Sequence, residues 1–260
     1  MKNIIDTILF DLDGTLYEKG RPIKTVVNTI EILRKERMKM GFITNTDGWP
    51  VKYIHNRLID MGFNISLDEI FTPIAAVREF FVNNTDKSCY CLVNDNVLKS
   101  FKNLNMNDIN PDYVVIGDFS DKISYEEINK VFRFIMNGSL ILALSKTKHY
   151  FQDNGININT GAFVSMFENA CDKEAILLGK PSKEFFNIVL SHLGSISSKT
   201  LVVGDDFTVD VVGAKSINAI SVLVKAGHYN EDLINKSKVK PDYIIEDITK
   251  LPSLLLELKR

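Results

Sequence analysis

Short apolar runs alternate along this chain with longer segments whose apolar residues recur every three or four positions. The short runs, closed by small or polar residues, predict buried strands, and the longer periodic segments predict amphipathic helices. Regular alternation of the two is typical of an α/β fold built on a parallel sheet. The predicted strands are 4–9, 41–44, 89–93, 113–116, 140–144, 175–178, 200–203, 221–224 and 243–245.

The periodic segments predict helices over 24–39, 51–61, 74–81, 97–101, 125–136, 163–170 and 183–193, with a last helix beyond Pro252. Residues 145–162 carry neither pattern and are expected to form a loop. Polar turn-forming residues at 83–86 interrupt the alternation, which then starts afresh, so we place a hinge there. We therefore expect a core domain of residues 1–83 and 178–260, with an inserted α/β domain of residues 84–177.

The first strand ends in two carboxylates and a glycine, Asp11, Asp13 and Gly14. Open α/β sheets bind ligands at the carboxyl ends of their strands, and Gly14 allows the chain to turn sharply at that edge. Two carboxylates so close in sequence are costly to hold together unless a cation neutralises them or they share a proton. The pattern therefore indicates a metal site or a shared proton, with a metal-free acidic turn as the alternative.

Further polar residues stand where other strands end, namely Thr44, Asn45, Lys180, Asp205 and Asp206. Parallel strands bring their carboxyl ends to one edge of a sheet, so these side chains are expected to converge on Asp11 and Asp13. Phosphoryl transfer needs an oxygen nucleophile, a bridging cation, donors to the phosphate oxygens and an acid for the leaving group. The set of residues favours a phosphoryl-transfer enzyme.

Asp11-Leu12-Asp13-Gly14-Thr15 after an apolar strand resembles the first signature of the haloacid-dehalogenase-like (HAD) phosphohydrolases. The resemblance implies that Asp11 is the nucleophile that takes up the phosphoryl group and that Asp13 is the general acid and base. Thr44 matches the second signature, whose hydroxyl binds phosphate, with Asn45 beside it. Lys180 matches the third, which holds nucleophile and phosphate together, and Gly204-Asp205-Asp206-x-x-x-Asp210 matches the fourth, whose acids hold Mg²⁺.

By this resemblance Mg²⁺ would be held by Asp11, the Asp13 main-chain carbonyl and Asp205, an all-oxygen set that suits this ion. Asp206 and Asp210 are expected to orient these ligands without binding the ion themselves. The implied fold is a HAD-like doubly wound parallel sheet, a Rossmannoid core, with an α/β cap of the C2 type inserted between the second and third signatures. Such a cap is typical of subfamily IIA, the NagD-like and nitrophenyl-phosphatase-like enzymes.

Within the inserted domain, Lys146, Lys148 and His149 belong to a basic and aromatic segment that resembles one in these relatives. The segment is expected either to lie near the leaving group, where it would favour compact anionic substrates, or to be solvated surface. A homodimer formed through the cap is a further expectation.

Composition limits the partners of the chain. Its 31 Lys and Arg residues nearly balance 33 Asp and Glu residues, so no large positive field attracts nucleic acid or anionic lipid. No apolar run approaches the length of a bilayer span, and the N-terminus lacks the pattern of a secretory signal, so we expect a cytoplasmic protein without membrane attachment. Cys89, Cys91 and Cys171 lack zinc spacing and are expected to be buried structural thiols, the first two on one face of a strand.

These observations predict a Mg²⁺-dependent phosphatase that hydrolyses small phosphorylated compounds, pyrophosphate and N-phosphoryl compounds among them, through an aspartyl-phosphate. A phospho-accepting receiver-type signalling domain uses similar residues, but the position of Asp13 two residues after Asp11 and the large insert count against it. A catalytically silent phosphate-binding protein is disfavoured because every signature residue is present.

Overall fold

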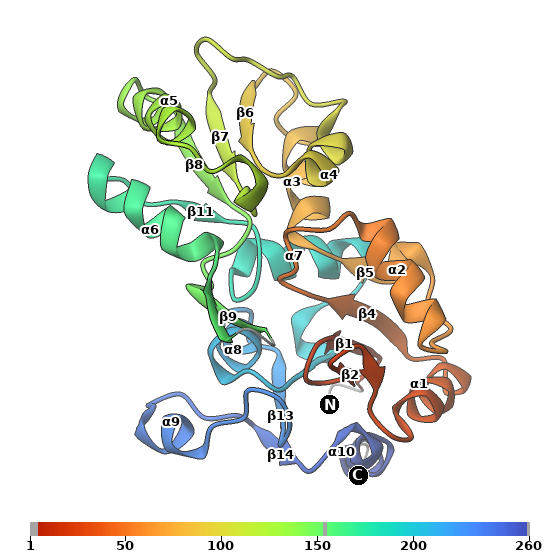
Figure 1. Ribbon diagram of the computed structural model, residues 1–260. Helices are drawn as coiled ribbons and strands as arrows, with labels where there is room; N and C mark the ends of the chain where they lie inside the picture. Colours follow the sequence, from red (N-terminus) through yellow and green to blue (C-terminus); the bar gives the residue numbers. More distant parts are fainter. Residues whose placement is uncertain (1–4, 153–154, 259–260) are drawn as a thin grey trace. The chain divides into compact units, whose positions relative to one another are not determined.

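The computed structural model describes residues 5–152 and 155–258 (Figure 1), so Ile4, where the first predicted strand begins, lies outside it. The contacts divide the chain into two compact units. The first comprises Met1–Thr44, Lys52–Phe71 and Lys180–Arg260, and the second comprises Asn45–Val51 and Thr72–Gly179. The expected domain limits differ from this division because they group residues 45–51, 72–83 and 178–179 with the core.

A six-stranded sheet in the order β14-β13-β12-β1-β4-β5 forms the centre of the first unit. Its strands are all parallel: β1 (Thr7–Asp11), β4 (Lys39–Ile43), β5 (Ile70–Phe71), β12 (Thr200–Gly204), β13 (Ile220–Val224) and β14 (Tyr243–Ile245). Every residue of β1 is buried, as expected for a central strand covered on both faces. The strand order runs outward from β1 in both directions, so the predicted doubly wound α/β fold is confirmed.

The helices of the first unit are α1 (Val26–Lys35), α2 (Val51–Asp60), α7 (Lys183–His192), α8 (Val212–Ser216), α9 (Glu231–Lys236) and α10 (Leu251–Leu258). A π-helical turn, Phe207–Val211, leads into α8, and a short hairpin of β2 (Tyr17–Glu18) and β3 (Arg21–Pro22) follows β1. Neither α9 nor this hairpin was predicted. Only Ile234 of α9 is buried, so the sequence carries no apolar stripe that would indicate the helix.

The second unit has its own parallel sheet in the order β11-β8-β7-β6, formed by β6 (Cys89–Leu92), β7 (Tyr113–Ile116), β8 (Leu140–Ala143) and β11 (Ile176–Leu177). Its helices are α3 (Pro73–Val82), α4 (Asp95–Leu98), α5 (Tyr125–Met136) and α6 (Thr160–Cys171). The inward faces of α5 and α6 pack with the sheet in one apolar core, which includes Val114, Ile116, Ile135 and Phe167.

The loop predicted over 145–162 is wrong in part. This segment contains an antiparallel hairpin of β9 (His149–Gln152) and β10 (Gly155–Ile158), and α6 begins at Thr160 with Asn159 as its N-cap. Ile156 and Ile158 are both exposed, so the alternation in β10 does not correspond to a buried face. The hairpin therefore lacks the burial on which a sequence-based strand prediction depends.

Hydrogen bonds of Asp47 and Gly48 connect the segment 45–51 to other parts of the second unit. The buried Asp47 carboxylate accepts a hydrogen bond of 2.6 Å from the Thr160 hydroxyl, and the neighbouring Gly48 carbonyl accepts one of 3.0 Å from the Asn94 side chain. Burial raises the pKa of Asp47 to about 6, Asp118 adds to the rise, and the bond from Thr160 opposes it. Folding therefore favours the protonated form of this carboxyl group.

We expect the unfolding free energy to fall as the pH rises from about 4 to about 6. The unfolded carboxyl ionises near its ordinary pKa, whereas the folded one resists ionisation until about pH 6, and this difference corresponds to about 3 kcal/mol. Asp47→Asn keeps an acceptor for Thr160 and should remove this part of the pH dependence. Urea unfolding at about pH 3.5 and about pH 7, on either side of this window, measures it. Parallel pH profiles of variant and wild type would contradict the assignment.

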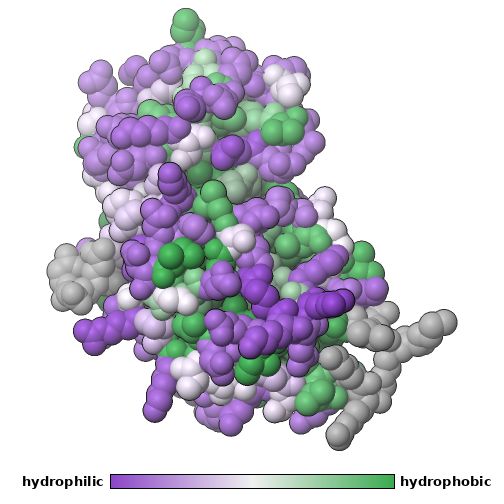
Figure 2. Space-filling view, turned by 90° about the vertical axis from the view of Figure 1, so that its right-hand side faces the viewer, coloured by the Kyte–Doolittle hydropathy of each residue, from purple (hydrophilic) through white to green (hydrophobic). Residues whose placement is uncertain are grey.

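The described residues contain no helix long and apolar enough to cross a bilayer. On the face drawn in Figure 2, hydrophilic side chains predominate and apolar ones are interspersed among them. Scattered apolar residues of this kind are ordinary on protein surfaces in contact with water.

Candidate active site

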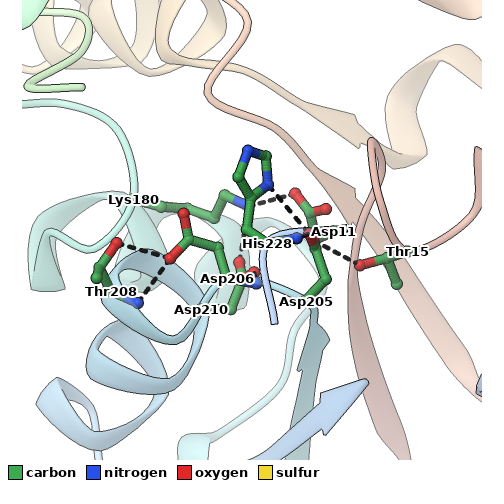
Figure 3. A network of polar contacts seen from close by, with 8 residues as sticks. All are labelled: Asp11, Thr15, Lys180, Asp205, Asp206, Thr208, Asp210 and His228. Atoms are coloured by element: carbon green, nitrogen blue, oxygen red, sulfur yellow. Dashed lines mark hydrogen bonds and ion pairs between the residues drawn. The ribbon is translucent and has the colours of Figure 1, made fainter. Parts of the chain in front are cut away.

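Three buried charged side chains meet at the carboxyl edge of the central sheet (Figure 3). The Lys180 ammonium donates hydrogen bonds to Asp11 Oδ1 and, at 2.7 Å, to Asp210 Oδ1. Asp11 ends β1, Lys180 stands before α7, and Asp210 lies on the π-helical turn after β12. The convergence that the sequence predicts for the first, third and fourth signatures is therefore present in the first unit.

Asp205 directly follows β12, and both of its carboxylate oxygens accept hydrogen bonds. Oδ1 accepts a hydrogen bond of 3.1 Å from the Thr15 hydroxyl, and Oδ2 accepts one of 2.7 Å from the His228 main-chain amide. The His228 ring adds a contact of 3.1 Å from Nδ1 to the same Oδ2, while its second nitrogen points away from Asp205 (Figure 3). These donors fix the orientation of a carboxylate that is 1% exposed.

The carboxylates of Asp11, Asp205 and Asp210 fit a divalent cation. One oxygen from each lies within 4.8 Å of the others. Asp11 Oδ2 is also the one buried side-chain oxygen or nitrogen in the described part of the chain that has no hydrogen-bond partner. A buried carboxylate oxygen without a donor is costly, so it points to a ligand that the side chains do not supply. Hard oxygen donors suit Mg²⁺.

Asp210 and Asp206 have structural partners of their own. Asp210 Oδ2 accepts a hydrogen bond of 3.2 Å from the Asp206 main-chain amide, so both Asp210 oxygens are engaged by the chain. Asp206 Oδ1 accepts hydrogen bonds from the amide and the hydroxyl of Thr208, at 2.7 and 2.6 Å, and caps the π-helical turn. The expectation that both acids orient the metal ligands without binding the ion stays a prediction.

The other predicted residues are placed as follows. Thr44 is buried next to Ile43, which lies beside Asp11 in the sheet register, so its backbone stands at the same edge. The Asp13 side chain is exposed. Asn45 and the three residues Lys146, Lys148 and His149 belong to the second unit, and their position relative to Asp11 stays a prediction. The Lys146 ammonium forms an ion pair of 2.6 Å with Glu168.

Comparisons with known proteins identify the family. A family model described as haloacid dehalogenase-like hydrolase matches residues 8–107, and one described as HAD-hydrolase-like matches residues 177–251. The haloacid dehalogenase-like hydrolase domain-containing protein 2 of Bos taurus is 33% identical over 237 residues, which cover 90% of each chain. The chain belongs to the haloacid-dehalogenase-like hydrolases. The predicted resemblance is thereby confirmed.

More distant relatives agree with this family. The phospholysine phosphohistidine inorganic pyrophosphate phosphatase of Xenopus laevis is 28% identical over 98% of this chain and 96% of its own length. Among solved structures, the p-nitrophenyl phosphatase of Archaeoglobus fulgidus matches with a TM-score of 0.89 at 23% identity, covering 96% of this chain and 99% of that one. NagD from E. coli K-12 matches with a TM-score of 0.87 at 20% identity, covering 95% and 98%. These structures share the fold.

Burial and the closeness of several carboxylates together set the electrostatics of the HAD-like site. Burial raises the pKa of Asp11 well above its ordinary value, and Asp210 and Asp205 add to the rise while Lys180 opposes it. Burial also raises the pKa of Asp13, with Asp205 adding to it. Against the effect of burial, the hydrogen bonds from His228 hold the pKa of Asp205 below its usual range, and the same contact raises the pKa of His228 to about 9. Lys180 and a protonated His228 together do not balance the four carboxylates of Asp11, Asp13, Asp205 and Asp210, which favours binding of a further cation.

Two glycines allow the chain to approach Asp205 closely. Gly14 and Gly227 have φ values of +86° and +47°, and a side chain at either would collide with the Asp205 carboxylate. Gly14 could be predicted from its place in the turn after β1, whereas Gly227 and His228 were not predicted. Their loop follows β13, a strand end without an acid or a hydroxyl residue, and His228 contributes partly through a main-chain amide that any residue except proline provides. The one available signal is the glycine beside a strand end.

Proposed function

We propose that this HAD-like hydrolase is a Mg²⁺-dependent phosphatase that works through a phosphoryl intermediate on Asp11. The proposal rests on one observation above all: the buried Asp11 carboxylate has Oδ1 bonded to Lys180 and Oδ2 without a partner. An oxygen held in this way, beside further acids at a strand edge, is suited to attack phosphorus. Bound through Asp11, Asp205 and the Asp13 carbonyl, Mg²⁺ would neutralise the charge of the phosphoryl group and of its nucleophile.

The residues of the site would divide the reaction between them. The Asp11 carboxylate attacks phosphorus in line, the bond to the leaving oxygen or nitrogen breaks, and Asp13 supplies the proton to that atom. Water then attacks the phosphorus of the aspartyl-phosphate while Asp13 accepts its proton, which releases phosphate and restores Asp11. Lys180 keeps the nucleophile oriented, and the hydroxyl of Thr44, with Asn45 beside it, binds phosphate oxygens.

Asp13 is suited to the role of acid and base. Partial burial of its carboxyl group raises the pKa of Asp13, which increases the protonated fraction near neutral pH. Its side chain is nevertheless exposed, so it can reach a substrate or a water molecule. A group that must both give and accept a proton needs such access.

The substrates we propose are small phosphorylated compounds, with pyrophosphate and N-phosphoryl compounds among them. The name of the Xenopus relative supports this choice, since that protein is called a phospholysine, phosphohistidine and pyrophosphate phosphatase. We also propose that the second unit is a C2-type cap, that the protein acts in the cytoplasm, and that it forms a homodimer through the cap.

A panel of phosphate esters, pyrophosphate and phosphoramidates, each with and without Mg²⁺, tests the proposed function. Activity should require Mg²⁺ and disappear in excess chelator after dialysis, because the buried carboxylates then lack their cation. Ca²⁺ should inhibit the Mg²⁺-loaded enzyme, since its larger and more flexible coordination shell admits extra ligands and displaces the nucleophile. Full activity in excess chelator would refute the proposal.

The basic segment of the second unit offers a separate prediction on selectivity. If Lys146, Lys148 and His149 place donors near the leaving group, replacing both lysines with alanine should raise KM for pyrophosphate more than KM for an aryl phosphate. Lys146 already pairs with Glu168, so Lys148→Ala alone should account for most of the effect. Lys130, on α5, lies over the Tyr90 ring, and Lys130→Ala serves as the matched control. Equal changes for both substrates would assign the segment to solvated surface.

A further inference from the structure

Three sulfur atoms of the second unit are in mutual contact. Cys89 Sγ and Cys91 Sγ are 3.9 Å apart, and Met106 Sδ lies 3.8 Å from the first and 3.9 Å from the second. The two cysteines stand two residues apart on β6, so their side chains share one face of the strand, as the sequence predicts. Met106 reaches the same face from the segment that follows Phe101. The three sulfur atoms thus form a nearly equilateral triangle.

The main chain fixes this arrangement. Met106 lies opposite Cys89 in an isolated parallel bridge. The Cys89 amide donates a hydrogen bond of 2.8 Å to the Asn105 carbonyl, and the Asn107 amide donates one of 2.9 Å to the Cys89 carbonyl. Cys91 lies on the same strand, β6, at the edge of the sheet, where it pairs with Val115 of β7. The positions of the sulfur atoms therefore follow from backbone pairing.

The triangle has the dimensions of a soft-metal site. A point equidistant from three atoms about 3.9 Å apart lies about 2.2 Å from each, close to the metal–thiolate distance of about 2.3 Å found for zinc. Thiolate and thioether sulfur together favour Cu(I) among the common metals. In the part of the chain that the structure describes, no third His, Cys, Asp or Glu completes a metal-binding group with the two cysteines, as a tetrahedral zinc site would need.

An ion could reach the triangle from its thioether corner. Cys89 is 0% and Cys91 7% exposed, whereas Met106 is 40% exposed and lines a surface pocket together with Lys99 and Phe101. The two buried thiols, which the phosphatase reaction does not use, are thus accessible to an ion through Met106 and the pocket that it lines.

We propose that Cys89, Cys91 and Met106 bind one Cu(I) ion in three-coordinate geometry. Binding replaces both thiol protons, which pass to the solvent, and leaves a centre of one Cu(I), two thiolates and one thioether with a net charge of −1 and no change of oxidation state. The site is independent of the proposed phosphatase function, because none of its ligands takes part in that reaction.

Titration of the reduced full chain with Cu(I), in anaerobic competition with bicinchoninate, tests the site. The wild type should bind one equivalent and release two protons at a pH where both thiols are otherwise protonated. Cys89→Ala and Cys91→Ala should each weaken binding by more than about 100-fold, since loss of a ligand costs more than loss of an outer partner. Cys171→Ala is the matched control, because it removes the remaining buried thiol and should leave the affinity unchanged.

Met106→Leu tests the proposed Cu(I) site even if an alanine substitution in β6 unfolds the second unit. Leucine has a similar size, and the position is partly exposed, so circular dichroism should remain that of the wild type. We expect at least about a tenfold weaker affinity, since the thioether is lost. An unchanged affinity in this folded variant, or an equal loss in Cys171→Ala, would overturn the proposal.

Discussion

Asp11→Asn is expected to lower kcat by more than about 10³-fold while leaving the fold intact. The amide keeps the volume of the carboxylate but lacks a nucleophilic oxygen anion, and it weakens the proposed cation site. Lys180 keeps its hydrogen bond to Asp210, and one of three crowded carboxylates is removed, so the metal-free variant should be no less stable than the wild type.

The measurement is kcat with p-nitrophenyl phosphate at saturating Mg²⁺, with thermal unfolding in chelator as the test of the fold. Asp68→Asn, a change at an exposed acid in the first unit, is the matched control and should keep wild-type activity. Retention of more than about one per cent of kcat by Asp11→Asn, in a preparation shown by mass spectrometry to be homogeneous, would remove Asp11 from its role as nucleophile.

Lys180→Met is expected to lower the unfolding free energy by about 3–5 kcal/mol in chelator, because it leaves the buried carboxylates of Asp11 and Asp210 without their cation. Methionine has a similar length, so lost volume contributes little. Mg²⁺ should recover part of the difference by binding the carboxylates in the folded state only. Urea unfolding in chelator and in Mg²⁺ measures both effects.

Lys215→Met provides the comparison for this loss of stability. Lys215 forms an ion pair of 2.5 Å with Asp242, but the two side chains are 32% and 36% exposed. Water screens such a pair, so we expect a change below about 1 kcal/mol. Equal losses in the two variants would contradict the account in which Lys180 compensates a buried cluster.

Much of the fold and of the site could be predicted because the signals were local. Asp11 and Asp205 follow buried apolar strands, and parallel pairing of β1 with β12 brings such strand ends together. Lys180 could be predicted in the same way from its place between a strand and a helix. Periodicity likewise indicated α5 with the limits that it has, Tyr125–Met136, because its apolar stripe faces a core.

The features that escaped prediction depend on contacts between distant residues or on the main chain. The isoleucines of the β9–β10 hairpin are exposed, so the order of apolar residues in β10 does not mark a buried face. His228 reaches Asp205 from 23 residues away, partly through an amide group. Met106 joins Cys89 across 17 residues, and only the isolated bridge shows that the two are opposed. Propensity and period describe neighbours along the chain, and these contacts arise from tertiary pairing.

The central claim is that the phosphoryl group rests on Asp11, and chemical trapping tests it most directly. In Asp13→Asn, hydrolysis of the intermediate should be slow because the proposed base is absent, whereas p-nitrophenolate is a good leaving group and needs little acid assistance. This variant, mixed with Mg²⁺ and p-nitrophenyl phosphate, is quenched and reduced with borohydride, which converts an aspartyl-phosphate to homoserine. Mass spectrometry of the peptides should find homoserine in place of Asp11 and at no other aspartate. Release of phosphate with Asp11 unmodified, or reduction at a different residue, would contradict the proposed mechanism.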